Sequence, residues 1–110
     1  MAVIDLEKYR TSNKTTKSRV FTGRDRGKDV RVSSEIDNKF ANADTLTIIV
    51  PDDIFSITPS FLEEFLFNIV RDFGKETVVK KLKFQGKYDI SQSFDEAIDR
   101  ILQKKNGLER

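Results

Sequence analysis

The chain has 110 residues, of which 37% are hydrophobic and 35% charged, with a formal net charge of +2 and no cysteine or histidine. This length predicts one domain with one modest hydrophobic core. Without cysteine or histidine the chain supplies no disulfide, thiolate nucleophile, Ser-His-Asp triad or typical zinc site. The carboxylates, lysines and hydroxyls that remain show no pair at a spacing that enforces convergence, so we predict no enzyme, no metal and no cofactor.

The sequence also favours a protein that stays out of membranes. No stretch approaches the roughly 18 consecutive apolar residues that a membrane span needs. The N-terminal segment MAVIDLEKYR has acids where a signal peptide has a basic region followed by an apolar one. We therefore expect a cytoplasmic location, while the oligomeric state stays open.

Positive charge is concentrated near the N-terminus. Residues 8–31 hold nine lysines and arginines against two aspartates, a net charge of +7, whereas residues 32–110 are mildly acidic. Such a block is either a surface for nucleic acid or another polyanion, or a solvated arm. Its candidate anion-binding residues are Arg24, Arg26, Lys28 and Arg31.

The first expected elements are short. Residues 3–6 and 20–21 indicate two strands, and GRDRG at 23–27 is typical of a turn. Three apolar residues then recur every four positions, which predicts a helix of about three turns; they are Val32, Ile36 and Phe40. We divide the chain into an N-terminal strand with a basic polar segment, 1–22, and a main domain, 23–110.

The segment TLTIIV at 45–50 is the clearest strand, because it is rich in β-branched residues and bounded by Asp44 and Pro51. Its apolar side chains alternate onto both faces, so we expect a central strand covered on both sides. KLKFQ at 81–85 predicts an edge strand. SFDEAIDRILQKK has Ser93 and Glu96 in capping-box spacing and predicts the closing helix.

The strongest helical pattern covers residues 59–73. Seven apolar residues form one continuous stripe, Glu63 and Glu64 fall on the polar side, and Gly74 stands at the expected C-cap. Phe67 lies off the stripe, where it either contacts a loop or the N-terminal arm or belongs to a partner-binding patch. The order strand, helix, strand, helix predicts an α/β fold, with parallel crossovers in a mixed sheet on which the helices pack.

A polar cluster, SITPS at 56–60, precedes this helix. With Thr58 as the N-cap, Pro59 takes the first helical position and Ser60 lies in the first turn. Free backbone donors and the helix dipole would favour a phosphate on Ser60, while Glu63 and Glu64 would partly oppose it. Ser60 and Glu63 also have capping-box spacing, so a purely structural role is the alternative.

The segments RGKDVR, TLTIIVPDDIFSITPSFLEEFL, KLKFQ and the last helix together resemble the bacterial STAS-like domains of unknown function, over roughly residues 23–103. The most specific element is ITPSFLEEFL. The resemblance implies a small STAS-like layer structure. In the related anti-anti-sigma factors a GHKL-type kinase phosphorylates a serine of an Asp-Ser-Ser-Gly motif, and residues 58–61 take its place here with Ser60 as the matching serine.

Two functions from different classes stay open. The first is a non-enzymatic regulatory protein-binding module that is controlled by phosphorylation of Ser60, with a GHKL-type kinase or another signalling protein as its partner. The candidate partner-binding residues are Asp53, Phe55, Thr58, Ser60 and Phe67. The second is a nucleic-acid or polyanion-binding module that uses the basic segment 8–31.

Overall fold

The computed structural model describes residues 2–10 and 18–107. The strands are β1 (Ala2–Asp5), β2 (Val20–Phe21), β3 (Leu46–Ile49), β4 (Ser56–Ile57) and β5 (Leu82–Gln85). The helices are the 3-10 helix η1 (Leu6–Tyr9) and the α-helices α1 (Arg24–Ser34), α2 (Ile36–Asn42), α3 (Pro59–Phe65), α4 (Phe67–Phe73), α5 (Lys75–Lys81) and α6 (Ser91–Gly107). This alternation of strands and helices confirms the predicted α/β class.

The main sheet has the order β1-β3-β5, with the predicted strand 45–50 at its centre and β5 at an edge, as expected. Leu46 pairs with Ala2 on one side and with Leu82 on the other, and both pairings are parallel. β2 and β4 form a separate two-stranded sheet, which is parallel too. The described strands therefore pair only in parallel, rather than in the mixed arrangement that we expected.

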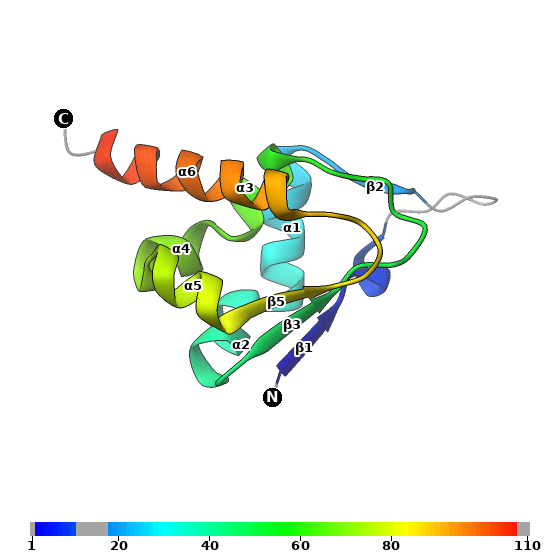
Figure 1. Ribbon diagram of the computed structural model, residues 1–110, viewed down its shortest axis with the longest axis horizontal. Helices are drawn as coiled ribbons and strands as arrows, with labels where there is room; N and C mark the ends of the chain where they lie inside the picture. The colour runs from blue at the N-terminus through cyan, green and yellow to red at the C-terminus, as the bar shows by residue number, and fades with distance from the viewer. Residues whose placement is uncertain (1, 11–17, 108–110) are drawn as a thin grey trace.

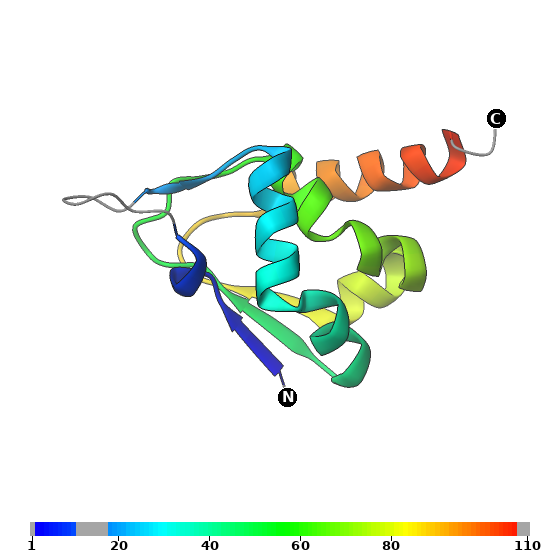
Figure 2. The same ribbon diagram turned by 180° about the vertical axis from the view of Figure 1, so that it is seen from behind.

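The α-helices cover one face of the main sheet. Figures 1 and 2 show them on the same side of β1, β3 and β5 in opposite views. Side chains alternate along a strand, so Ile48 and Leu82 are buried under the helices, whereas Val3 and Lys83 on the other face are exposed. The expectation that both faces of strand 45–50 are covered is wrong, because Ile49 lies on this open face and is only partly buried.

The described part of the N-terminal segment, residues 2–10 and 18–22, belongs to the same fold. β1 supplies an edge of the main sheet, and β2 pairs with β4 from the middle of the chain. Phe21 in β2 is buried, and its ring centroid lies 5.2 Å from that of Phe61 in α3. Two short strands from the N-terminal segment thus contribute to the core that positions α3.

The expected turn at 23–27 is wrong, because α1 begins at Arg24. Gly27 lies inside this helix, where a Cβ atom would stand 2.2 Å from the backbone oxygen of Phe61. The glycine therefore allows α1 and α3 to approach closely rather than marking a turn. Sequence patterns do not distinguish these two uses of glycine.

The single helix expected around Val32, Ile36 and Phe40 is also wrong, because Glu35 adopts a left-handed conformation with φ 55° and ψ 37°. α1 ends before Glu35 and α2 begins after it. Val32 is consequently 68% exposed, whereas Ile36 and Phe40 are fully buried. The four-residue spacing arose from two helices with different faces.

The predicted helix 59–73 is divided into α3 and α4 by a bend at Leu66, where φ is −100° and ψ is 1°. Its apolar stripe stays largely buried, although Phe73 is 41% exposed. Gly74 ends α4 as predicted, with φ 85°, and the chain then forms α5, which the sequence reading missed. The bend gives two seven-residue helices instead of one long one.

The last helix begins at Ser91, earlier than the predicted capping box of Ser93 and Glu96, which is therefore wrong. The carboxylate of Asp89 accepts hydrogen bonds from the backbone N–H and the hydroxyl of Ser91 and satisfies the start of the helix instead. Among the described residues no helix has the length and apolar character that crossing a membrane requires.

Candidate functional site

Ser60 lies at the start of α3, as the sequence predicted. The hydroxyl of Thr58 accepts a hydrogen bond from the backbone N–H of Phe61 at 3.3 Å, and Pro59 occupies the first turn, which confirms Thr58 as the N-cap. The same hydroxyl accepts a second bond from the N–H of Gly23 at 3.4 Å. Thr58 therefore connects the start of α3 with the residue that precedes α1.

A surface pocket brings Ser60 together with the N-terminal end of α1. The pocket is lined by Thr22, Gly23, Arg24, Asp25, Arg26, Asp29 and Ser60. Two of the predicted anion-binding arginines thus share a pocket with the predicted phosphorylation site, although more than 30 residues separate them along the chain. No sequence spacing linked these two predictions.

Arg100 of α6 reaches the same serine from another side. Its Nη1 atom donates a hydrogen bond to the Ser60 hydroxyl at 3.4 Å and lies 3.7 Å from a carboxylate oxygen of Glu63. Its Nη2 atom pairs with Glu96 one turn earlier on α6. The guanidinium is therefore oriented by groups from two helices, and its side chain is still 38% exposed.

Glu63 is the buried charge at the centre of this cluster. The sequence placed it on the polar side of a helix, which is wrong, because it is fully buried where α3 meets α1 and α6. Its Oε2 atom accepts a hydrogen bond from Arg24 Nη1 at 2.8 Å and also pairs with Lys104. Its Oε1 atom has no hydrogen-bond partner.

Three cations compensate for this burial. Desolvation acts to raise the pKa of Glu63, but the hydrogen bonds and charges of Arg24 and Lys104 outweigh it and hold the pKa below its usual value. The pKa of the Arg24 guanidinium is raised by the same hydrogen bond. Arg100 and Lys104 stand one turn apart on α6, and their i, i+4 spacing was the only sequence signal that they act together.

The other predicted anion-binding residues have separate roles. Arg31 donates a hydrogen bond to the backbone oxygen of Glu64 at 2.6 Å and is largely buried. Arg26 donates a hydrogen bond to the backbone oxygen of Tyr9. Lys28 is exposed on α1. Much of the basic character of α1 is thus used in contacts within the chain.

The loop before β4 carries Asp53 and Phe55. The Asp53 carboxylate accepts two hydrogen bonds from the nearly buried guanidinium of Arg10, at 2.7 and 3.0 Å, and these bonds hold the pKa of Asp53 below its usual value. Arg10 also donates to the backbone oxygen of Ser18. The side chain of Phe55, by contrast, is 67% exposed.

Phe67 lies apart from the pocket around Ser60, at the start of α4. It is half-buried against the core, and the Arg71 guanidinium lies 5.6 Å from its ring centroid. The Ser60 pocket is lined by residues 22–26, Asp29 and Ser60, so Phe67 does not share it. The structure therefore does not join all five predicted partner-binding residues in one pocket.

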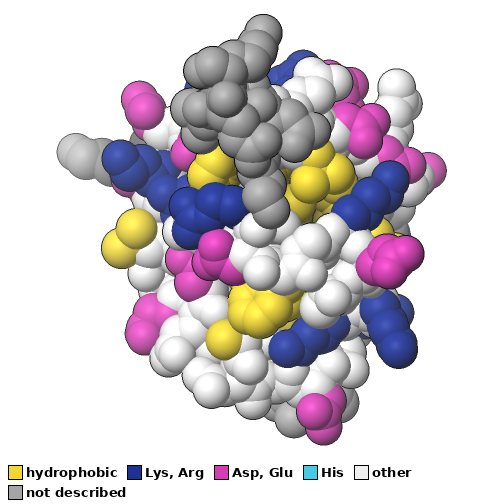
Figure 3. Space-filling model, turned by 90° about the vertical axis from the view of Figure 1, so that its left-hand side faces the viewer, with side chains coloured by type: hydrophobic (Ala, Val, Ile, Leu, Met, Phe, Trp, Pro, Cys, Tyr) yellow, Lys and Arg dark blue, Asp and Glu magenta, His cyan; other side chains and the backbone are white. Residues whose placement is uncertain are grey.

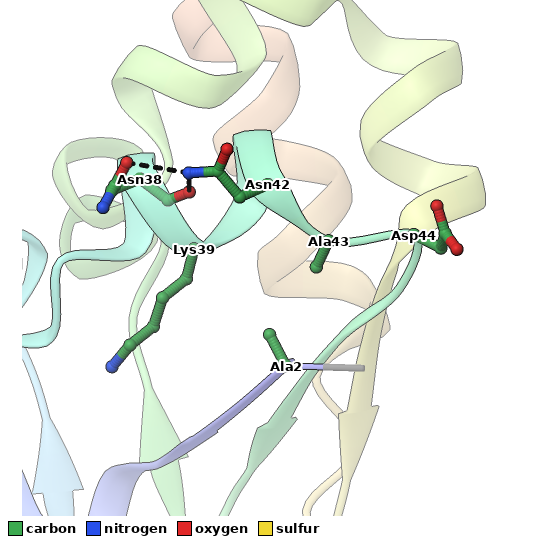
Figure 4. Close-up of a pocket in the computed structure, with 6 residues that line it drawn as sticks. All are labelled: Ala2, Asn38, Lys39, Asn42, Ala43 and Asp44. Carbon is green, nitrogen blue, oxygen red and sulfur yellow. Dashed lines mark hydrogen bonds between the residues drawn. The ribbon is translucent and has the colours of Figure 1, made fainter.

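Two other surface features lie away from the Ser60 pocket. Figure 4 shows a shallow pocket between the start of β1 and the end of α2, where Asn42 bonds Asn38 and the Lys39 side chain extends separately. Figure 3 shows the side of the molecule on which α4 and α5 lie, with hydrophobic side chains in separate patches between charged ones. Neither feature gathers groups that indicate a particular chemistry.

The described residues contain no group of three or more acidic side chains placed to hold a metal ion. Comparisons with protein-family models, with curated proteins and with solved structures find no match for this chain. The candidate site is therefore defined by its own geometry: a partly buried serine that is bonded by Arg100 and shares a pocket with Arg24, while both arginines also pair with the buried carboxylate of Glu63.

Proposed function

We propose that this chain is a non-enzymatic regulatory module that binds another protein through the loop before α3, and that phosphorylation of Ser60 controls this binding. The resemblance to STAS-like domains supports the proposal, and with it we propose a GHKL-type kinase or another signalling protein as the partner. We further propose that the module acts in the cytoplasm.

The observation that carries the proposal is how the loop presents Phe55. Ile54 and Ile57 on either side of it are buried, and the backbone N–H of Phe55 donates a hydrogen bond to the oxygen of Arg19 at 3.0 Å. The loop is thus anchored while one large aromatic ring points to solvent. An aromatic side chain on a fixed loop is well suited to insert into a pocket of a partner.

The loop leads directly into the turn that holds Ser60. Ser60 follows Phe55 by five residues, and the backbone between them is fixed by the β2–β4 pairing and the Thr58 cap. A phosphate would add a charge of about −1.5 to −2 beside the binding surface. It would therefore weaken the docking of an apolar partner surface.

Affinity capture from native lysate tests the proposal, with the wild-type chain, Phe55→Ser and a chain carrying phosphoserine at position 60 as baits. We expect a protein that the wild type retains and that both altered baits lose. Val32→Ser is the matched control, because Val32 is exposed to a similar extent on α1, and this bait should retain the protein.

Two results would contradict the proposal. If all baits retain the same protein, neither Phe55 nor Ser60 takes part in binding. If they retain only nucleic acid that is released by moderate salt, the chain binds polyanions through its basic segment instead. Circular dichroism of each bait establishes that the altered chains are folded.

A further inference from the structure

One cation bonds Ser60, a second lines the pocket that Ser60 lines, and both also pair with the carboxylate of Glu63. Arg100 Nη1 lies 3.4 Å from the Ser60 hydroxyl and 3.7 Å from Glu63 Oε1. Arg24 lines the Ser60 pocket and donates a hydrogen bond to Glu63 Oε2. The two side chains are 38% and 48% exposed, and a guanidinium has five N–H donors, so each arginine can bond more than one acceptor.

We propose that a phosphate on Ser60 is held within the chain by Arg100 and Arg24, which share their donors between the phosphate and Glu63. This inference rests on the proposed function. The planar guanidinium fork matches phosphate oxygens and binds them with short charge-assisted hydrogen bonds. Because Arg24 belongs to α1 and Arg100 to α6, the phosphate connects three helices through one group.

The modification itself needs a kinase and a nucleoside triphosphate. The Ser60 oxygen attacks the terminal phosphorus, the O–P bond forms as the bond to the nucleoside diphosphate breaks, and the hydroxyl proton passes to a base of the kinase. Ser60 lines a surface pocket and is only partly buried, and its hydroxyl accepts a hydrogen bond from Arg100. A phosphate on this partly buried serine therefore extends toward solvent rather than into the core.

The charges around the pocket allow Arg24 and Arg100 to bond a phosphate as well as Glu63. Arg26 lines the pocket as a further cation, while Asp25 and Asp29 from the same helix oppose the phosphate. Glu63 also opposes it, but Lys104 pairs with Glu63 as well, so Glu63 keeps a dedicated cation while Arg24 and Arg100 share their donors with the phosphate. Arg100 requires the smallest movement, because it already bonds the oxygen that carries the phosphate. Arg100 is therefore the principal phosphate-binding residue.

Phosphorus NMR of the full chain with genetically encoded phosphoserine at position 60 tests the inference. An unperturbed phosphoserine has its second pKa near about 6. We expect this pKa to be lower in the otherwise wild-type chain by about half a unit or more, because nearby cations favour the dianion. Arg100→Gln should return at least half of the shift, and Arg24→Gln a smaller part.

The matched control is Arg71→Gln, which removes an arginine that pairs with Asp72 on α4 and should leave the phosphate titration unchanged. If Arg100→Gln does not fold, Arg100→Lys is titrated instead, and loss of the fork with the charge retained should give an intermediate value. An ordinary pKa in the wild-type background, or equal values with and without Arg100, overturns the inference.

These results are independent of the partner. A lowered phosphate pKa would support binding of the phosphate by Arg100 and Arg24. If the phosphorylated and wild-type baits then capture the same protein, the proposed function is contradicted. Loss of the captured protein on phosphorylation, together with an ordinary phosphate pKa, would support the proposed function and contradict the binding of the phosphate by the two arginines. The two ideas can therefore fail separately.

Discussion

Gly27 and Glu63 show how single residues acquire roles from distant contacts. Gly27 lies in α1, yet its lack of a side chain matters because the backbone of Phe61 passes beside it. Glu63 has a charge that would normally stay in water, yet α1 and α6 surround it with cations. In both cases the residue type is explained by another helix, not by its neighbours in the sequence.

Gly27→Ala should destabilise the fold, because the added methyl group meets the Phe61 backbone oxygen at 2.2 Å and α1 must move away from α3. Alanine is normally the better helix former, but overpacking at a backbone contact outweighs this, and we expect a net loss of about 1–3 kcal/mol. Chemical denaturation measures the free energy of unfolding. Ser33→Ala, at an exposed position of the same helix, is the control and should change it little.

A gain in stability for Gly27→Ala would mean that the two helices do not approach as closely as the structure indicates. The same comparison distinguishes a packing glycine from a turn glycine. A turn would tolerate the methyl group wherever φ is negative, whereas the contact with Phe61 leaves no space for it.

At the scale of elements, the hydroxyl of Thr58 connects the N-terminal ends of two helices, α1 and α3. Its hydroxyl satisfies the N–H of Phe61 inside α3 and the N–H of Gly23 just before α1. α3 is only seven residues long, so isolated helical propensity contributes little to its stability. The cap and the packing of its apolar face therefore determine where α3 begins.

Thr58→Ala should lower the free energy of unfolding by about 1–2 kcal/mol, because one hydroxyl is lost and two backbone donors lose their acceptor. Thr58→Ser keeps the acceptor oxygen and should restore most of this stability. Denaturation curves of both variants check the prediction. Equal losses for alanine and serine would show that the methyl group, rather than the hydroxyl, matters at this position.

Local patterns were informative where one element has one clear environment. Residue types alone predicted four features that are confirmed: the strand at 45–50, the edge strand at 81–85, the N-cap at Thr58 and the C-cap at Gly74. The breaks at Glu35 and Leu66 were missed, because apolar spacing continued across them. The bend at Leu66 keeps most of the same residues buried and so leaves little trace in a periodic pattern. At Glu35 the pattern was misleading for another reason, because Val32 continues the apolar spacing although it is exposed.

At the scale of the whole molecule, the chain uses much of its charge internally. Arg10 joins η1 to the loop at Asp53, and Arg24, Arg100 and Lys104 join α1 and α6 to Glu63 in α3. These contacts link segments that lie far apart in the sequence. Protonation of these carboxylates at low pH should therefore lower the free energy of unfolding of the whole domain.

The free energy of unfolding should stay nearly constant from pH 7 to about pH 5 and fall below about pH 4.3, the ordinary glutamate pKa. The pKa of Glu63 is lower in the folded chain, despite its burial, because of Arg24 and Lys104. Its contribution is complete above the unfolded value and is lost as the pH falls through the folded pKa, at up to about 1.4 kcal/mol per pH unit. The pKa of Asp53 is lowered by Arg10, in the same direction.

Denaturation at several pH values between 3 and 7 measures this dependence. Glu63→Gln should lower stability at pH 7 and make the fall below pH 5 less steep, whereas Glu76→Gln, at an exposed position in α5, should leave the profile nearly unchanged. An acid profile that does not change in Glu63→Gln would mean that Glu63 does not couple protonation to folding.

The sequence by itself determined the α/β class, the central strand, the edge strand and the start of α3, because each depends on residues that are close along the chain. It also identified Ser60, Arg24 and Arg26 as separate candidates. Only the tertiary structure placed these residues at one pocket, added Arg100, and buried Glu63 beneath them. The physical reason is that a charged cluster is formed by helix packing, and contacts between side chains of α1, α3 and α6 leave no periodic pattern in the sequence.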